Sequence, residues 1–169
     1  MRAKGLEDVF RVLNESGARY LVAGGLAVVA HGYVRLTMDI DLVVQLTESN
    51  LLKALSALKT LGYHPTVPVE LLDFASSGNR EMWMKKKGMV VFQLVSDQFP
   101  TEPIDIFAKE PFDFDFEYNR APRHELGDGL FIPVVGFNAL MNMKRIANRP
   151  KDLIDMNYLR QLHPENGDT

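Results

Sequence analysis

Residues 21–44 read LVAGGLAVVAHGYVRLTMDIDLVV, and this stretch decides the fold class of the chain. Its apolar start is typical of a β-strand that ends at the glycine pair Gly24-Gly25. Residues 26–30 are expected to resume as a helix, and residues 38–44 as a second strand. The stretch therefore predicts a strand, a double-glycine turn, a short helix and an acidic strand in close succession.

Regular spacing of apolar residues predicts the other elements of the chain. Helical spacing predicts helices at residues 6–13, 47–61, 137–147 and 151–162. Strand-like runs bounded by turn residues predict strands at residues 19–23, 38–44, 104–107 and 130–135, and a hairpin of residues 81–86 with 89–95. Residues 63–79 read as irregular chain with a short helical piece, and residues 112–118 match neither periodicity.

This order of elements predicts an α/β (α+β) fold with a small mixed β-sheet flanked by helices. Residues 1–135 form the expected core, and residues 136–163 form a C-terminal helical pair that extends the same domain. Residues 164–169 are expected to be a frayed tail. The sequence contains no internal repeat or low-complexity linker, so we expect one domain.

The composition narrows the class of protein without naming a function. The chain has 169 residues, no cysteine and a net charge of −3. Disulfides, thiol nucleophiles and cysteine zinc sites are therefore excluded, and any phosphate-binding surface must be local. The charged residues 1–8 do not resemble a signal peptide, and no apolar run approaches the roughly 20 residues of a membrane span. We expect a cytoplasmic protein with no membrane partner.

Two short strands carry aspartates between apolar neighbours. Side chains alternate along a strand, so Asp39 and Asp41 are expected on one face and Ile40 on the other. Asp105 repeats the pattern between two isoleucines. Carboxylates this close repel each other, and a hard divalent cation such as Mg²⁺ or Mn²⁺ turns that repulsion into coordination. The pattern suggests a carboxylate triad suited to two-metal phosphoryl chemistry.

Another explanation for these aspartates is simple alternation on two half-exposed strands. A D-x-D pair on its own is weak evidence for a metal site. Aspartate is disfavoured in strands, however, and three aspartates in two such settings favour a function.

The glycine pair follows a strand and opens a helix. Glycine lets the backbone approach a ligand, and the free N–H groups of a helix start attract phosphate. The spacing matches neither the G-x-G-x-x-G of dinucleotide-binding folds nor the G-x-x-x-x-G-K-[ST] of P-loops. For an isolated glycine pair, a tight strand-to-helix turn is the more common explanation.

Together these motifs resemble the polymerase-beta-like nucleotidyltransferases, whose signature is a glycine turn, an h-D-x-D-h strand and a later single acid. The chain looks closest to the minimal bacterial branch that includes AbiEii-type toxin nucleotidyltransferases. Members of that branch often show Gly-Gly, His-Gly, Arg and Thr before the acidic pair. The matching residues are Gly24, Gly25, His31, Gly32, Arg35, Thr37, Asp39 and Asp41.

The resemblance implies metal-dependent transfer of a nucleoside monophosphate from an NTP to an acceptor hydroxyl on RNA or protein. It implies that Asp39, Asp41 and Asp105 are catalytic and bind the metals, with Asp105 helping to activate the acceptor. The Gly24-Gly25 turn would hold the triphosphate. Many members carry serine after the first glycine, so here backbone N–H groups must replace a hydroxyl contact to phosphate.

Further nucleotide contacts are expected near the acidic strand and in the C-terminal helices. By the same resemblance, Arg35 and Thr37 would bind the nucleotide. The branch also shows a lysine and an Arg-x-Lys-Asp motif, which Lys144 and residues 149–152 match, so Lys144 and Lys151 are expected to meet polyphosphate. A solvated helix face in which Lys151 pairs with Asp155 explains these charges equally well.

Three functions remain open. The first is nucleotidyl transfer with Mg²⁺ or Mn²⁺. The second is a catalytically silent binding module of the same fold, for example one that meets an antitoxin partner in a toxin–antitoxin pair. The third is a Mg²⁺-dependent phosphohydrolase, which needs the same metals. The intact acidic triad favours transfer, and the acidic net charge leaves room for the binding module.

Overall fold

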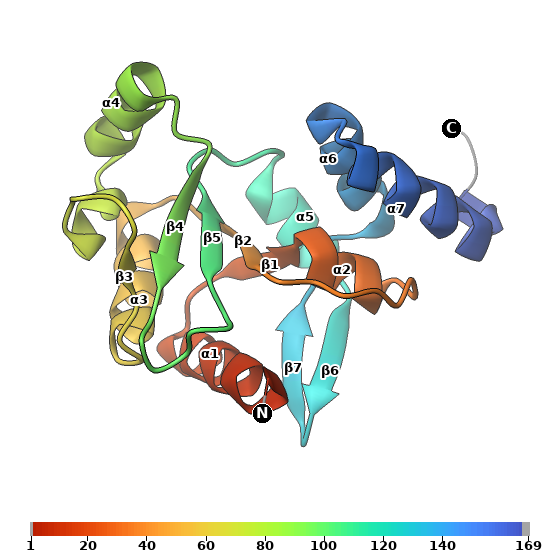
Figure 1. The fold of residues 1–169 in the computed structure, drawn as a ribbon, viewed down its shortest axis with the longest axis horizontal. Coiled ribbons are helices and arrows are strands. Elements are labelled where there is room, and N and C mark those ends of the chain that lie inside the picture. Colours follow the sequence, from red (N-terminus) through yellow and green to blue (C-terminus); the bar gives the residue numbers. More distant parts are fainter. Residues whose placement is uncertain (1, 167–169) are drawn as a thin grey trace.

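The helices and strands form one five-stranded sheet and one two-stranded hairpin, with helices packed around them (Figure 1). The structure, a computed structural model, describes residues 2–166. Its helical segments are α1 (Arg2–Ser16), α2 (Gly24–Ala30), α3 (Glu48–Lys59), η1 (Leu71–Ala75), α4 (Ser77–Lys87), α5 (Phe114–Arg120), α6 (Phe137–Ala147), α7 (Pro150–Leu162) and η2 (Pro164–Asn166). Its strands are β1 (Tyr20–Ala23), β2 (Ile40–Val44), β3 (His64–Pro65), β4 (Val91–Val95), β5 (Ile104–Phe107), β6 (Arg123–Gly127) and β7 (Leu130–Pro133).

The larger sheet is mixed and has the strand order β1-β2-β5-β4-β3. The central strands β2 and β5 run parallel, and the other neighbouring strands run antiparallel. A parallel pair needs a long crossover connection, and here the chain between β2 and β5 carries α3, η1, α4 and two further strands. The predicted small mixed sheet flanked by helices is confirmed.

Alternating burial separates the two faces of this sheet. The side chains at alternate positions of β2 and β5 are at most 2% exposed: Ile40, Leu42, Ile104 and Ile106. On the same face, Tyr20 of β1 stacks on Phe10 of α1, and α1 packs against α3. Asp41 and Asp105 occupy the intervening positions, so they point to the opposite face.

The two C-terminal helices lie at the far corner of the molecule from α1 and α3 (Figure 1). α6 ends at Ala147, and the next residue, Asn148, adopts a left-handed conformation with φ 50°. Pro150 begins α7. Proline suits the first turn of a helix because its missing N–H has no intrahelical partner there. The predicted helical pair that bends at Pro150 is confirmed. The division into a core of residues 1–135 and an extension stays a prediction.

The predicted hairpin of residues 81–86 with 89–95 is wrong. Residues 81–86 belong to α4, which begins where the Ser76 side chain accepts a hydrogen bond from the Asn79 N–H. It ends at Lys87, and the next residue, Gly88, has a φ of 64°, a left-handed conformation that is common directly after a helix. Glutamate, methionine and lysine favour helices, and these local preferences outweigh the short strand-like pattern.

The structure also contains elements that the pattern did not identify. Residues 112–118 contribute to α5, which Asp113 caps by accepting a hydrogen bond from the Phe116 N–H. β6 pairs with β7 across a turn at Asp128. β3, of two residues, adds the last edge of the larger sheet.

Two predicted boundaries need correction. β2 begins at Ile40, so Asp39 lies directly before the strand and not on it. α3 is capped by Thr47 as predicted, but it ends at Lys59. Of the predicted tail, residues 164–166 form η2 and residues 167–169 lie outside the described residues. Within residues 2–166, none of the helices combines the length and apolar character that a membrane crossing requires.

Candidate active site

Two aspartates lie side by side in the middle of the sheet. Asp41 is the second residue of β2, Asp105 is the second residue of β5, and the two are direct partners in the parallel pairing. Partners on neighbouring strands point to the same face. The structure therefore brings together two of the three predicted carboxylates, and Asp39 lies two residues from Asp41, just before the strand.

The electrostatics of these groups show strong mutual repulsion. Burial, followed by the charges of Asp105 and Asp39, raises the pKa of Asp41 from 3.8 to about 6. Burial and the charge of Asp39 also raise the pKa of Asp105, against a lowering contribution from Gln93, its partner on β4. Asp39 therefore lies close enough to affect both other carboxylates.

A divalent cation fits this set of groups. Asp105 Oδ1 is buried and has no hydrogen-bond partner among residues 2–166, which is costly for a carboxylate oxygen. Carboxylate oxygens are the donors that Mg²⁺ and Mn²⁺ prefer. As the side chains stand, no three histidine, aspartate or glutamate groups among residues 2–166 converge on one point as metal ligands. Asp39 would have to turn towards the Asp41–Asp105 pair to share an ion with it.

The position of the Asp41 side chain leaves no room for a Cβ on Gly24, the first glycine of the turn. Gly24 has a left-handed φ of 59°, which side-chain-bearing residues rarely adopt. A Cβ on Gly24 would lie 2.7 Å from Cγ of Asp41 and 2.9 Å from its Cβ, which is closer than real contacts allow. The glycine turn therefore lies directly against the carboxylate pair, on the same face of the sheet.

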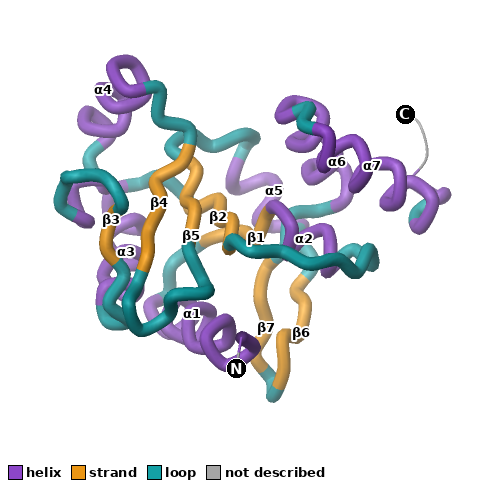
Figure 2. Tube along the Cα trace, viewed as in Figure 1, coloured by secondary structure: helices purple, strands orange, loops and turns teal. Residues whose placement is uncertain are grey.

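The second glycine packs against the loop that leads into β2. A Cβ on Gly25 would lie 2.7 Å from the Thr37 Cβ and 3.4 Å from Arg35 Nη1. This loop, residues 31–39, runs as extended chain beside α2 (Figure 2). Thr37 and Arg35, both predicted nucleotide ligands, are thus placed beside the glycine turn. Their contact with a nucleotide stays a prediction.

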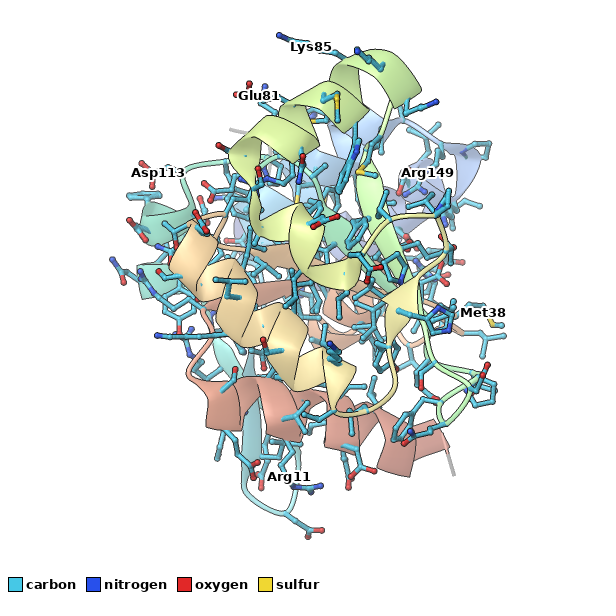
Figure 3. The ribbon with its side chains drawn as sticks, turned by 90° about the vertical axis from the view of Figure 1, so that its left-hand side faces the viewer. Arg11, Met38, Glu81, Lys85, Asp113 and Arg149 are labelled. Atoms are coloured by element: carbon cyan, nitrogen blue, oxygen red, sulfur yellow. The ribbon has the colours of Figure 1, made fainter. Side chains whose placement is uncertain are left out.

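The beginning of α7 supplies positive charge to the carboxylates. Lys151 and Arg149 both lower the pKa of Asp41, although burial and the other aspartates outweigh them. Arg149 and Met38, the residue before Asp39, lie at the same edge of the molecule in Figure 3, opposite Asp113. Lys151 is exposed, so its side chain is available to an anionic ligand.

Lys144 and Arg35 have protein partners. Lys144 is 5% exposed and its Nζ lies 2.9 Å from Asp155 Oδ2 and 3.2 Å from Asp152 Oδ1. Arg35 also binds Asp155, so the cations on this acid are Arg35 and Lys144, and not the Lys151 of the alternative explanation. Their predicted binding to polyphosphate stays a prediction.

The sequence pattern did not predict the burial of the two acids of α7, nor the polar partner of Asp105 on β4. Asp152 and Asp155 are almost fully buried, which a charged helix pattern does not reveal. Asp152 could have been recognised as a helix-capping residue, because it stands at the third position after Arg149. Gln93 is a polar residue in the middle of an apolar strand, and that was the available signal for its place beside Asp105.

Solved structures with a similar fold match nearly the whole chain. A solution structure of the antibiotic-resistance factor ANT(2'')-Ia has a TM-score of 0.56 at 16% identity, covering 98% of this chain and 84% of that one. A crystal structure of ANT(2'')-Ia with adenylyl-2''-tobramycin has a TM-score of 0.57 at 14% identity, covering 98% and 89%. The lincomycin-bound lincosamide adenylyltransferase LnuA has a TM-score of 0.58 at 17% identity, covering 94% and 96%.

Neither the family models nor the curated proteins contain a match to this sequence. At identities this low, the structural similarity shows the fold alone. The narrower AbiEii-type branch stays a prediction. The chain has the fold of the nucleotidyltransferases ANT(2'')-Ia and LnuA, with an aspartate pair and a glycine turn on one face of its central sheet.

Proposed function

We propose that the protein transfers a nucleoside monophosphate from an NTP to an acceptor hydroxyl. The observation that carries the proposal is the register of Asp41 with Asp105 beside the Gly24 turn, within a nucleotidyltransferase fold. The acceptor oxygen forms a bond to the α-phosphorus, and the bond from that phosphorus to the bridging oxygen breaks. Pyrophosphate leaves, and a carboxylate, proposed to be Asp105, takes the hydroxyl proton.

Asp39, Asp41 and Asp105 are the proposed ligands of Mg²⁺ or Mn²⁺. The oxygen of Asp105 that has no partner among residues 2–166 and the raised pKa of Asp41 support this assignment. A cation would coordinate that oxygen and offset the repulsion that raises the pKa. When bound, the ion would supply charge stabilisation to the attacking and leaving oxygens.

The proposed phosphate contacts surround these carboxylates. The Gly24-Gly25 turn offers backbone N–H groups, and Ala23, at the helix start, provides no side-chain cap that would compete for them. Thr37 lies against that turn. Lys151 is exposed and its charge already acts on Asp41.

The acceptor class is proposed to be RNA or protein, as the resemblance to toxin nucleotidyltransferases implies. The structures with the same fold act on small molecules: one holds adenylyl-2''-tobramycin and another is a lincosamide adenylyltransferase. A small hydroxylated molecule is therefore a second acceptor class, and the experiment must distinguish it from the first.

The test is incubation of the protein with each α-labelled NTP, Mg²⁺ or Mn²⁺, and separately total RNA, total protein or a set of hydroxylated antibiotics. We expect label on one acceptor class and none with Asp41→Asn. Asp128→Asn is the matched control, because Asp128 is exposed in the β6–β7 turn, where its φ of 48° suits asparagine. NTP binding without product would favour the silent binding module, and release of inorganic phosphate would favour the phosphohydrolase.

A further inference from the structure

An ionic cluster around two buried acids joins the loop of residues 31–39 to the C-terminal helices. Its members, defined here as the α7 cluster, are Arg35, Lys144, Arg149, Asp152 and Asp155. The two acids are at most 1% exposed. Three cations surround two acids, so each acid has more than one positive partner. Removing one partner of a buried ion pair leaves an uncompensated charge, so the loss of a member of this cluster is expected to be costly.

Arg35 is the member that lies outside the C-terminal helices. Its Nε and Nη2 atoms donate to Asp155 Oδ1 and Oδ2 at 2.8 and 2.9 Å, a two-pronged geometry that fixes the guanidinium plane. Its third nitrogen, Nη1, donates to the Leu36 carbonyl oxygen at 2.9 Å, so each nitrogen has a protein acceptor. Two residues earlier, the Tyr33 ring stacks on Tyr158 of α7 at 4.5 Å between ring centres.

The loop has little else to hold it in place before it reaches Asp39. Within the described chain, none of the backbone N–H groups of residues 34–38 donates to another backbone group. The next such donor is Ile40, whose N–H binds the Pro103 carbonyl oxygen at 2.9 Å. Arg35 lies within this unpaired stretch, and its Nη1 would be 3.4 Å from a Cβ placed on Gly25.

We propose that the Arg35–Asp155 pair is a positioning device that holds Thr37 and Asp39 in the active site. Arg35 then acts through the loop and not as a ligand of the nucleotide. The inference rests on the proposed function, because it assigns to the loop the task of presenting Asp39 to the metal. It also ties the loop to the helix that carries Lys151.

The test compares Arg35→Ala and Asp155→Asn with the wild type in the absence of nucleotide. Mn²⁺ affinity is measured by electron paramagnetic resonance of free Mn²⁺, and the mobility of residues 33–39 by hydrogen exchange. We expect each variant to bind Mn²⁺ about tenfold more weakly, as changes that disturb the support of metal ligands do. We also expect faster exchange in this loop. Arg145→Ala and Asp128→Asn, which remove exposed charges elsewhere, are the matched controls.

Arg35→Ala should recover part of its Mn²⁺ affinity in millimolar guanidinium, which can occupy the vacated place beside Asp155, while Asp155→Asn should not recover. If Arg35→Ala leaves Mn²⁺ affinity and loop exchange unchanged and only raises the KM for NTP, Arg35 is a nucleotide ligand and the inference is overturned. If the alanine variant does not fold, Arg35→Lys is measured in its place, because lysine keeps the charge but loses the two-pronged contact. A wild type that binds no Mn²⁺ would contradict the proposed function instead, and loop exchange would still decide whether the pair holds the loop.

Discussion

Asp41 and Asp105 are direct partners on the parallel strands β2 and β5, so two half-buried carboxylates face the same side of the sheet. Such a pair destabilises the metal-free protein when both groups are ionised, since like charges in a poorly solvated place repel each other. A cation would relieve the repulsion.

Asp41→Asn should change the stability of the metal-free protein in a pH-dependent way. The pKa of Asp41 is about 6 in the folded protein and 3.8 in its ordinary state, so the folded protein holds this proton more tightly. The stability contribution of Asp41 is therefore fully present below about pH 4 and is lost as the pH rises through about 6. We expect equal melting temperatures near pH 4 and a variant more stable by about 1 kcal/mol at pH 8.

The same melting curves should be recorded with Mn²⁺ at fixed ionic strength. The wild type should gain stability above pH 6, where Asp41 is ionised, and Asp41→Asn should gain none. Indifference of the wild type to Mn²⁺, together with a variant no more stable than it at pH 8, would remove the physical basis for a metal site.

Asp105→Asn should lower the transfer rate by about 100-fold or more, because the variant loses a proposed metal ligand and the proposed proton acceptor. The readout is single-turnover transfer of labelled nucleotide, with Asp128→Asn as control. An Asp105→Asn enzyme within about twofold of the wild type would exclude Asp105 from the chemistry.

Gly24→Ala should destabilise the fold more than Gly17→Ala. Both glycines have a left-handed φ, of 59° and 75°, but a Cβ on Gly17 meets nothing within 4 Å, whereas one on Gly24 meets Asp41. The backbone penalty is shared, so the difference reports the contact with the carboxylate, and we expect about 1–3 kcal/mol. Denaturant unfolding of the two variants measures it, and equal losses would show that Asp41 moves aside freely.

Lys151→Ala should weaken NTP binding and change the pH dependence of Mn²⁺ binding. The lysine lowers the pKa of Asp41, so its removal should raise that pKa further and move the onset of Mn²⁺ binding to higher pH. Arg145→Ala removes a comparable exposed charge from α6 and should do neither. An unchanged pH profile together with unchanged NTP affinity would place the phosphates away from α7.

The central part of the fold could be predicted because short-range signals agree there. The run from Leu21 to Val44 combines alternation, a glycine turn and a second apolar strand, and β5 coincides with its predicted range. The failure at α4 has a local cause as well: residues 81–86 suit either period, and the cap at Ser76 decides the outcome.

The site was predictable only as far as residue type reveals position. The alternation of residues around Asp105 predicted which face of its strand it occupies. Its pairing with Asp41 spans some sixty intervening residues, and no local sequence pattern reveals it. The burial of Asp155 is likewise a result of tertiary packing, because it depends on Arg35 arriving from a distant loop. The sequence therefore led us to assign Arg35 and Lys144 to a nucleotide, without indicating that both side chains bind Asp155.

The most direct measurement is anomalous diffraction from crystals grown with Mn²⁺ and a non-hydrolysable NTP analogue. We expect a manganese peak within about 2.5 Å of one carboxylate oxygen from each of Asp41 and Asp105, with the triphosphate against the Gly24-Gly25 turn. A manganese peak elsewhere, or an ordered nucleotide whose phosphates lie away from that turn, would contradict it.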